Sequence, residues 1–360
     1  VGTTVLVPFS HRQVVGYIVG VSDNVSSGLD VSRVLQITQV LADSAFDEQS
    51  AQVAEWMSKE YACSYADALH PFLAPGQKVK VTRKDADSPW QLVCEKSGPV
   101  DERWVELTEK SDNFTPAANA SKQRSVLEAL VQGAMRLSEL SATIPGARSV
   151  VTALQKKGIV EVRTQRQIRG SQEGLGTTLS SGVAPRPQQL TDGQVSALEA
   201  IEAAQTAAQG DVVLIDGVTG SGKTEVYLSA IEKTLAEGRG AVVLVPEISL
   251  TAQTVGRFRS RFGEQVAVLH SKLSLGERFD QWDLIRQGRA RVVVGARSAL
   301  FAPIQNPGLY IIDEEHEASY KQDSLPRYHA REVAAQMARL RGAALVLGSA
   351  TPSLEGLYRT

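Results

Sequence analysis

The stretch VVLIDGVTGSGKT, residues 212–224, decides the fold of the chain around it. It begins with an apolar run of the kind found in buried strands and ends with a full match to the pattern G-x-x-x-x-G-K-[ST]. The helical sequence EVYLSAIEKTLA follows directly. A strand, a glycine-rich loop and a helix in this order are the context in which the pattern binds phosphate. The sequence therefore predicts a nucleotide-binding loop over residues 217–224.

The residue types of this loop explain how it would hold a nucleotide. Glycine allows the backbone to curl so that its N–H groups face a phosphate, at a helix N-terminus that favours negative charge. Lys223 would place a cation between the β- and γ-phosphates, and the hydroxyl of Thr224 would bind Mg²⁺. We therefore expect ATP and Mg²⁺ as cofactors. The expected nucleotide contacts are Gly217, Thr219, Gly220, Ser221, Gly222, Lys223 and Thr224.

Strand and helix patterns alternate from residue 188 onward. The predicted strands are apolar throughout, which is typical of a parallel sheet covered by helices on both faces. They are Val212–Asp216, Ala241–Val245, Gln265–Leu269, Arg291–Gly295, Leu309–Asp313 and Ala344–Gly348. The fold class predicted for residues 188–360 is therefore α/β, a RecA-like motor lobe built on a P-loop.

A second motif, Asp313-Glu314-Glu315-His316, follows the apolar run GLYII. A carboxylate at the end of a neighbouring parallel strand can reach a metal opposite the P-loop. Asp313 would hold Mg²⁺, usually through water, and Glu314 would orient or deprotonate the attacking water. Acidic clusters are common on surface turns, but this one follows a buried strand beyond a P-loop. The D-E-x-H form indicates a helicase-like ATPase of superfamily 2, with Lys223, Asp313, Glu314 and His316 as candidate catalytic residues.

Other polar segments agree with superfamily 2. Gln194 precedes the P-loop, where such motors place a glutamine that reads adenine. Polar segments also follow three further predicted strands, namely PEISLTAQ at 246–253, GARSALF at 295–301 and GSATP at 348–352. The carboxyl ends of strands form the edge where open α/β sheets bind ligands. In helicases such segments contact the backbone of single-stranded DNA and couple that contact to ATP, which makes Arg297 and Ser298 candidates for DNA contact.

The chain before the motor lobe divides into four parts. Residues 1–78 predict a small β-rich domain with at least one helix, and residues 79–120 are polar and weakly patterned, as in a linker. Residues 121–170 predict a compact helical unit, and the Gly-, Ser- and Pro-rich residues 171–187 predict a second linker. The elements expected in the first part are strands at Thr4–Phe9, Val14–Val21 and Val34–Leu41 and a helix at Glu48–Tyr61.

Residues 121–170 carry a local positive charge. They hold nine Lys and Arg against three Asp and Glu, whereas the whole chain has a formal net charge of −2. An apolar stripe at 126–131, helical patterns at Leu137–Leu140 and Ser149–Lys157, and a strand-like wing at Ile159–Arg163 are typical of a winged-helix module. Lys156 and Lys157 would then contact DNA, and a small structural bundle with a solvated face is the alternative.

Composition limits the other classes of function. Cys63 and Cys94 are the two cysteines of the chain, and they lie too far apart in sequence for a metal-ligand motif. Neither a signal peptide nor a long apolar span is visible, so the sequence does not predict export or membrane insertion. The expected compartment is the cytoplasm, with reduced thiols.

Several segments together resemble the PriA family of replication-restart helicases (primosomal protein N′). They are GVTGSGKTEVYL, VPEISLTAQT, LHS, GARSALFAP, IIDEEHEASYKQ, PRYHARE and GSATPSLE. The resemblance is close over residues 188–360. It is looser at the start, where VLVPFSHRQVVGYIVGV is similar to the family's N-terminal DNA-binding domain, and at 121–168, which is similar to its winged helix.

The resemblance implies an ATP-dependent 3′-to-5′ DNA helicase of stalled forks. Forked, single-stranded and duplex DNA would be its partners, together with primosome proteins and single-strand-binding proteins. It also implies that an aromatic-rich loop after the DEEH motif senses single-stranded DNA, and the matching residues are Tyr320, Arg327, Tyr328 and His329. Aromatic faces can stack on bases, and Arg can stack or bind phosphate.

The resemblance further implies that this chain is the N-terminal part of such an enzyme. The family's second motor lobe, its arginine finger and its zinc-binding cysteines would follow Thr360, so we expect no zinc ligand here and weak ATP hydrolysis by this chain alone. Two alternatives stay open. One is another superfamily 2 translocase or repair ATPase, and the other is a non-catalytic fragment that binds DNA and nucleotide.

Overall fold

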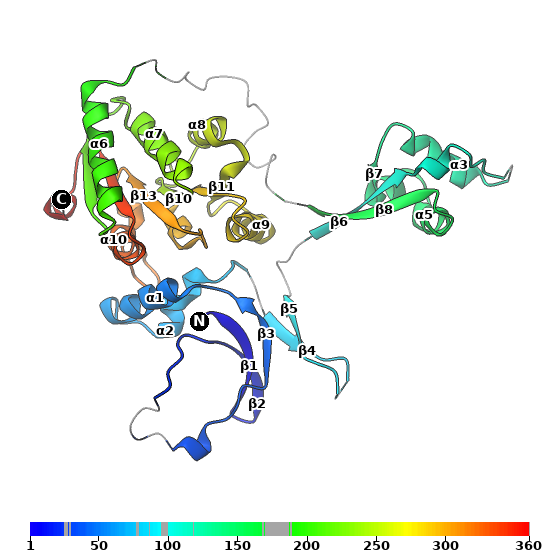
Figure 1. The fold of residues 1–360 in the computed structure, drawn as a ribbon, viewed down its shortest axis with the longest axis horizontal. Coiled ribbons are helices and arrows are strands. Elements are labelled where there is room, and N and C mark those ends of the chain that lie inside the picture. The colour runs from blue at the N-terminus through cyan, green and yellow to red at the C-terminus, as the bar shows by residue number, and fades with distance from the viewer. Residues whose placement is uncertain are drawn as a thin grey trace. The chain divides into compact units, whose positions relative to one another are not determined.

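The computed structural model describes residues 1–24, 28, 30–76, 79–85, 87–94, 100–117, 119–167, 169, 187 and 189–359. The chain forms two compact units (Figure 1). One consists of Val1–Gly98 with Gly170–Thr360, and the other of Pro99–Arg169. The predicted linker over 171–187 lies outside the described residues except for residue 187.

The larger unit is built on a parallel sheet of six strands in the order β11-β12-β10-β13-β14-β9. The predicted strands are confirmed to within two residues at each end. Their bounds are β9 Val212–Asp216, β10 Gly240–Leu244, β11 Val266–Leu269, β12 Val292–Gly295, β13 Pro307–Asp313 and β14 Ala344–Ser349. Five of the six are buried or nearly so along their length, as their continuous apolar sequences predict.

Helices cover both faces of this sheet, as the alternating pattern predicts (Figure 1). One face packs against α6 (Asp192–Ala207), α7 (Lys223–Ala236) and α8 (Ala252–Phe262). The other packs against α9 (Leu275–Arg286) and α10 (Ala330–Arg341). In β10, Ala241 and Val243 belong to the first core while Val242 and Leu244 belong to the second. Alternate side chains of one strand therefore hold both layers in place.

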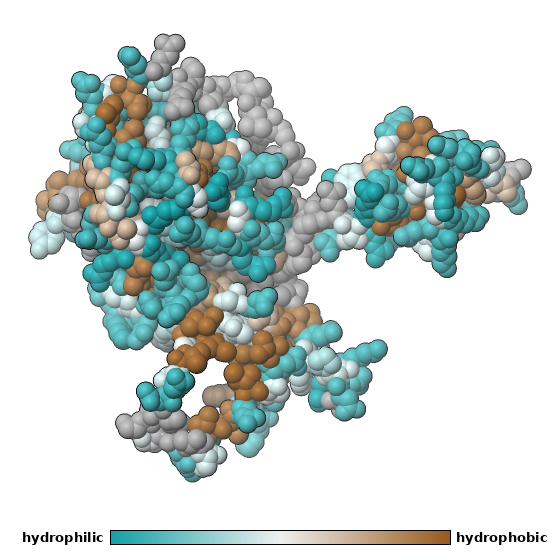
Figure 2. Space-filling model, viewed as in Figure 1, coloured by the Kyte–Doolittle hydropathy of each residue, from teal (hydrophilic) through white to brown (hydrophobic). Residues whose placement is uncertain are grey.

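The N-terminal residues form the expected β-rich structure. Strands β1 (Thr3–Phe9), β2 (Arg12–Tyr17) and β3 (Gln39–Ser44) make an antiparallel sheet in the order β2-β1-β3. The expected second strand is shorter than predicted, and the third begins later, at Gln39. Exposed apolar side chains gather over this part of the chain (Figure 2). They are Phe9, Val14, Val19, Val21, Val34, Leu35, Ile37 and Val40.

Helix α1 (Glu48–Glu60), which the sequence predicts, joins this sheet to the motor lobe. Its buried Val53 and Met57 belong to the same apolar core as Met337 of α10. Asp47 caps α1 and accepts two hydrogen bonds of 2.9 Å from Arg341, at the end of α10. The predicted domains 1–78 and 188–360 therefore share one core, although nothing in either sequence segment marks the partner surface.

Two short helices follow α1 and extend the same contact. They are α2 (Tyr65–Leu69) and the 3₁₀ turn η2 (His70–Phe72). The ring of Phe72 meets that of Phe301 edge-on, with the ring centroids 4.9 Å apart. Phe301 closes η5 (Arg297–Phe301), the 3₁₀ turn that follows β12. The N-terminal domain thus packs directly beside the segment GARSALF.

Residues 79–120, expected to be a linker, contain regular structure instead. Strands β4 (Val79–Thr82) and β5 (Gln91–Cys94) pair antiparallel, and β6 (Val100–Leu107) is the central strand of a second sheet, β7-β6-β8. The charged residues of β6 conceal its pattern. They form cross-strand ion pairs, with Glu106 2.6 Å from Arg163 and Glu102 3.1 Å from Arg136, while Val105 is buried.

The smaller unit contains the predicted three helices and the strand after them. The helices are α3 (Ser121–Leu130), α4 (Leu137–Thr143) and α5 (Ala147–Lys156), and the strands that pair with β6 are β7 (Met135–Arg136) and β8 (Val160–Gln167). Val126 and Leu130 of the expected stripe are buried, but Val131, the residue that caps the end of α3, is exposed. Among the described residues, no helix is long and apolar enough to span a membrane.

Candidate nucleotide-binding site

The P-loop lies where the sequence predicts it, between β9 and α7. Gly220 and Gly222 have φ angles of +83° and +87°, in the left-handed region that favours glycine. Gly222 is the residue that precedes α7, so the loop turns directly into the N-terminus of a long helix. The main-chain N–H of Gly217 donates to the oxygen of Ser349, 3.0 Å away, which fixes the loop against the end of β14.

Lys223 is almost fully buried beneath this loop. Its Nζ donates a hydrogen bond of 2.6 Å to the Gly217 oxygen and lies 3.7 Å from a carboxylate oxygen of Glu314. The structure therefore brings together the lysine of the first motif and an acid of the second, which stand far apart in the sequence. They meet because both motifs follow strands of one parallel sheet and so lie at the same edge.

Asp313 ends β13 at this edge, in an environment that disfavours its charge. Burial raises the pKa of its carboxyl group, and the negative charge of Glu314 acts in the same direction, while the Tyr227 hydroxyl, the charge of Lys223 and the main-chain N–H of Glu314 oppose them. The Tyr227 hydroxyl donates to the Asp313 Oδ1 atom over 3.0 Å. A cation beside Asp313 would relieve this cost, which is the electrostatic setting that a Mg²⁺ ligand requires.

His316 completes the second motif and joins it to the end of β14. Its Nδ1 atom lies 2.7 Å from the Ser349 Oγ atom and 3.7 Å from a carboxylate oxygen of Glu314. Ser349 is fully buried, and its main-chain oxygen also accepts the hydrogen bond from the P-loop at Gly217. Ser349 therefore touches both motifs, a link that the sequence segment GSATP only suggests.

A pocket of about 770 Å³ opens above these residues. Gln194 borders it, where its Nε2 atom donates to the Ser221 oxygen over 3.3 Å and its Oε1 atom accepts from the main-chain N–H of Thr191. The glutamine expected to read adenine thus lies beside the P-loop, held by a capping box at the start of α6. The P-loop residues that border the pocket are Val218, Thr219, Gly220, Gly222, Lys223 and Thr224.

Helix α8 supplies pocket residues that the sequence patterns do not reveal. Arg257 and Arg261 border the pocket beside the P-loop. Arg261 is held by Glu232 at 2.5 Å and by Glu225 at 3.0 Å, both on α7. The positions of Arg257 and Arg261 beside the pocket follow from the packing of α8 against α7, and no sequence motif or spacing predicts them.

The residues of the pocket fit a nucleoside triphosphate with Mg²⁺. The glycine cradle, the helix N-terminus and Lys223 suit phosphates, and Thr224 and Asp313 supply oxygen atoms of the kind that Mg²⁺ prefers. Among the described residues, no group of three His, Cys, Asp or Glu side chains could hold a metal ion by itself. A Mg²⁺ ion at this position would be held by Thr224 and Asp313, and it would neutralise phosphate charge.

The two tyrosines expected to stack on DNA bases are buried. Tyr320 is 1% exposed, and its hydroxyl donates to the main-chain oxygens of Asp313 and Leu244 over 2.6 and 3.1 Å. Tyr328 is 4% exposed and packs edge-on against Phe301, with the centroids 5.1 Å apart. Stacking requires an open ring face, so this structure gives both rings a packing role because protein already covers them.

Arg297 is half-buried and also has protein partners. Its guanidinium donates to the main-chain oxygens of Ser319 and Lys321 and lies over the ring of Tyr328. It therefore holds the loop that follows the DEEH motif. Ser298, by contrast, is exposed.

The remaining candidates for DNA contact lie at the surface or near it. Arg327 is exposed, and His329 is half-buried at the start of α10, where its Nδ1 atom accepts from the main-chain N–H of Arg331. In the smaller unit, Lys156 and Lys157 are exposed at the end of α5. Their exposed positions are compatible with binding a phosphate backbone.

Glu315 is a further residue whose importance the motif pattern does not show. Its carboxylate is fully buried and accepts from Arg331, at 2.7 Å, and from both the N–H and the hydroxyl of Ser353. Burial acts to raise its pKa, but these hydrogen bonds outweigh burial and hold the pKa below its ordinary value. The DEEH turn is thus tied to α10 and to the segment after β14.

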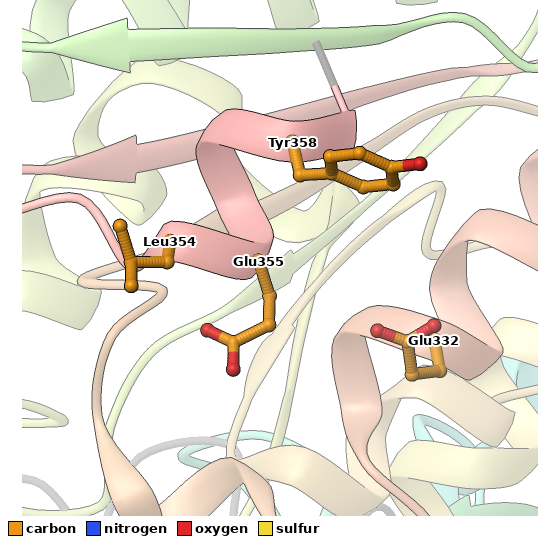
Figure 3. A pocket seen from close by; sticks show the side chains of 4 residues that line it. All are labelled: Glu332, Leu354, Glu355 and Tyr358. Carbon is orange, nitrogen blue, oxygen red and sulfur yellow. The ribbon is translucent and has the colours of Figure 1, made fainter.

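A separate pocket of about 630 Å³ lies next to this cluster, between α10 and the short helix α11 (Leu354–Arg359). Glu332 borders it from α10, and Leu354, Glu355 and Tyr358 border it from α11 (Figure 3). With two carboxylates and no basic side chain among these residues, it does not suit a phosphate.

Two known protein families match the two ends of the larger unit. Residues 192–360 match the family of DEAD/DEAH box helicases. Residues 1–74 match a 3′ DNA-binding domain described from PriA proteins. The two matches together leave out the segment that holds the smaller unit, residues 99–169.

Individual relatives share sequence over almost the whole chain. The replication restart protein PriA of Bacillus subtilis is 34% identical over 99% of this chain and 50% of its own length. That of Synechocystis is 32% identical over 99% of this chain and 49% of its own length. The PriA protein of Treponema pallidum is 49% identical over 47% of this chain and 25% of its own length. The chain spans about half the length of the first two relatives.

Proposed function

The chain belongs to the family of PriA replication restart proteins, and we propose that the protein works as an ATP-dependent 3′-to-5′ DNA helicase that binds forked DNA and starts primosome assembly. The family matches show a 3′ DNA-binding domain and a helicase domain on one chain. We propose in addition the direction of movement, the preference for forks and the loading of other proteins.

One observation carries the proposal. Lys223, Asp313 and Glu314 meet in one pocket at the carboxyl edge of the sheet, in a chain that begins with a DNA-binding domain. A helix N-terminus and a buried lysine suit binding of a triphosphate, and two acids at the end of β13, at the same edge of the sheet, suit its hydrolysis. A protein that only bound DNA would need neither acid at this position.

The proposed reaction is in-line attack of water on the γ-phosphate. Lys223 would neutralise charge on the β- and γ-phosphates, and the N–H groups of the P-loop would hold them. Bound Mg²⁺, held by Thr224 and Asp313, would supply further neutralisation of the phosphate charge. Glu314 would orient the water and accept its proton, and His316 would connect that acid to Ser349.

Two groups of residues are the proposed contacts with DNA. The loop from Lys321 to His329 follows the DEEH turn, and Arg297 holds it against the segment after β12. The exposed Arg327 and Ser298 are the proposed contacts with single-stranded DNA. Lys156 and Lys157 are the proposed contacts with duplex DNA in the smaller unit. Primosome proteins and single-strand-binding proteins would be its further partners in the cytoplasm.

The test is ATP hydrolysis by the complete protein, with and without forked DNA, followed by unwinding of partial duplexes with a 3′ or a 5′ single-stranded tail. We expect forked DNA to stimulate hydrolysis and unwinding to require movement from 3′ to 5′. Hydrolysis that DNA does not stimulate would contradict the proposal. Equal stimulation by forked and unbranched DNA would instead favour another superfamily 2 translocase. Residues 1–360 alone should hydrolyse ATP slowly, and rapid DNA-stimulated turnover by them would contradict that expectation.

A further inference from the structure

Three segments of the motor lobe meet at the side chain of Glu315. One is the DEEH turn itself, the second is the start of α10 with Arg331, and the third is Ser353, just beyond GSATP. The Glu315 side chain has no exposed surface and that of Arg331 is 7% exposed. Arg331 and Ser353 also bond each other over 2.7 Å, so each of the three groups contacts the other two.

The residue before Glu315 has a strained backbone. Glu314 has a φ of 45°, in the left-handed region that is unfavourable for a residue other than glycine. Such a conformation persists only where the surroundings hold it. Here the residues on both sides are anchored. Asp313 accepts from Tyr227, and Glu315 accepts from Arg331 and Ser353, while its N–H donates to Gly348.

The strain has a consequence for where the Glu314 carboxylate lies. In the left-handed conformation one of its oxygens lies 3.7 Å from the Lys223 Nζ atom, and the other lies 3.7 Å from the His316 Nδ1 atom. If Glu314 relaxed to an ordinary backbone conformation, its side chain would leave this direction. The position of the acid therefore depends on the anchors beside it.

We infer that Glu315, Arg331 and Ser353 form a buried latch that positions Glu314 for hydrolysis. The inference rests on the proposed function, because Glu314 acts there as the group that activates water. Glu315 and Arg331 are positioning residues and touch no part of the nucleotide pocket. Their role is to hold the turn on which the acid stands.

A buried ion pair suits this role better than an apolar contact would. Apolar replacements of such pairs are often as stable or more stable, so an ion pair is weak support for a purely stabilising role. The ion pair also fixes the orientation of the groups that it joins. A carboxylate with three donors at 2.7–2.8 Å accepts only one orientation of the turn.

The latch also reaches toward the proposed DNA contacts. Arg331 lies two residues after His329, and His329 forms a β-bridge with Lys321 at the base of the loop between them. A shift of this loop on binding DNA would move Arg331, and with it the turn that carries Glu314. Loss of the latch should therefore lower the rate of hydrolysis when DNA is bound, without changing the affinity for ATP.

The experiment is a comparison of Glu315→Gln with Asp47→Asn in the complete protein. Both replacements keep the shape of the side chain and remove the charge that pairs with an arginine of α10, Arg331 in one case and Arg341 in the other. Asp47 lies outside the nucleotide pocket, so it controls for a general effect of breaking an ion pair with this helix. ATP turnover at saturating forked DNA is measured below the melting temperature of each variant.

We expect Glu315→Gln to lower kcat by about 10- to 100-fold, since a misplacement near 1 Å costs about this much. Its KM for ATP should stay within about twofold, and Asp47→Asn should keep the wild-type kcat. A wild-type kcat in folded Glu315→Gln would overturn the inference while leaving the proposed function intact. An inactive wild-type protein would instead contradict the proposed function.

Ser353→Ala is the second variant, and it keeps the ion pair while removing one hydrogen bond to each partner. We expect a fall in kcat of several-fold, in the same direction and again without a change in KM. If Glu315→Gln does not fold, this milder variant decides the question. An unchanged kcat in Ser353→Ala, or an increase in KM equal to the fall in kcat, would contradict a positioning role.

Discussion

The hydroxyl of Tyr320 donates hydrogen bonds to the main-chain oxygens of Asp313 and Leu244, at the ends of two neighbouring strands of the motor sheet. A tyrosine that the sequence places in a DNA-sensing loop is thus part of the structure beneath the nucleotide site. Burial raises its pKa well above the ordinary value, with the negative charge of Asp313 adding to the effect, so the hydroxyl stays protonated and donates.

Tyr320→Phe should therefore act on stability and not on DNA affinity. It removes a donor from two buried acceptors, which costs about 1–3 kcal/mol of the free energy of unfolding. Chemical denaturation would measure this loss, and fluorescence anisotropy with single-stranded DNA would show an unchanged affinity. A change below about 0.5 kcal/mol, as is usual for a surface side chain, would contradict the buried position.

The sequence predicts the motor lobe well because its signals are local. Each strand is a continuous apolar run, and each functional motif directly follows a strand, so the sheet's parallel order brings Lys223 and Asp313 to one edge. The burial of Tyr320 and Tyr328 is not local. It depends on Leu244 and on Phe301, which come from other strand ends, and no pattern within the loop distinguishes a buried tyrosine from one that faces DNA.

The strand at residues 100–107 was not predicted from the sequence because its signal is also not local. Its charged residues look like a solvated linker until Arg136 of β7 and Arg163 of β8 are placed opposite Glu102 and Glu106. The contact between Asp47 and Arg341 likewise joins residues almost 300 positions apart, and neither has a local signal of its partner. Long-range ion pairs of this kind are invisible to periodicity and to motif spacing.

Lys223→Ala should abolish ATP hydrolysis and unwinding in the complete protein. It removes the cation that stands between the P-loop and Glu314, and loss of one such electrostatic group lowers the rate by about 10²-fold or more. Binding to forked DNA should be largely kept, because the DNA-binding domain at residues 1–74 lies outside the pocket.

Lys233→Ala is the matched control for this change. Lys233 lies on the same helix, α7, and forms a surface ion pair with Glu202 at 2.5 Å. It should leave hydrolysis unchanged, since exposed pairs contribute little. Turnover of the Lys223→Ala variant at the rate of the control would show that the site has been assigned wrongly.

Charge reversal at Lys156 and Lys157 should weaken binding to duplex DNA and reduce its dependence on salt. If both lysines contact phosphates, the slope of log K against log salt should fall by about 1.8, or about 0.9 for each contact. Arg163→Gln serves as a control, since Glu106 and Glu161 already lie 2.6 and 3.3 Å from its guanidinium. An unchanged slope in the lysine variant would favour a structural helical unit without a DNA-binding role.

His329 should make the stability of the lobe depend on pH. Burial lowers its pKa from 6.5 to about 4, with Arg331 and Lys321 acting in the same direction. The neutral ring accepts the hydrogen bond that caps α10, and a doubly protonated ring could not. The native state binds fewer protons at His329 than the unfolded state does between these two pKa values. The contribution of His329 to the free energy of unfolding is therefore fully present above about pH 6.5 and falls as the pH drops toward 4.

The variant His329→Asn isolates this effect, because Asn can cap a helix in the same way but does not titrate. Denaturant unfolding of both proteins from pH 7 to pH 4 gives the difference between their free energies of unfolding, which cancels the contribution of the carboxylates that they share. We expect the wild type to lose more stability than the variant over this range. Equal losses would mean that the imidazole is protonated in the folded protein at the same pH as in the unfolded chain, and that the cap at the start of α10 does not rely on the neutral ring.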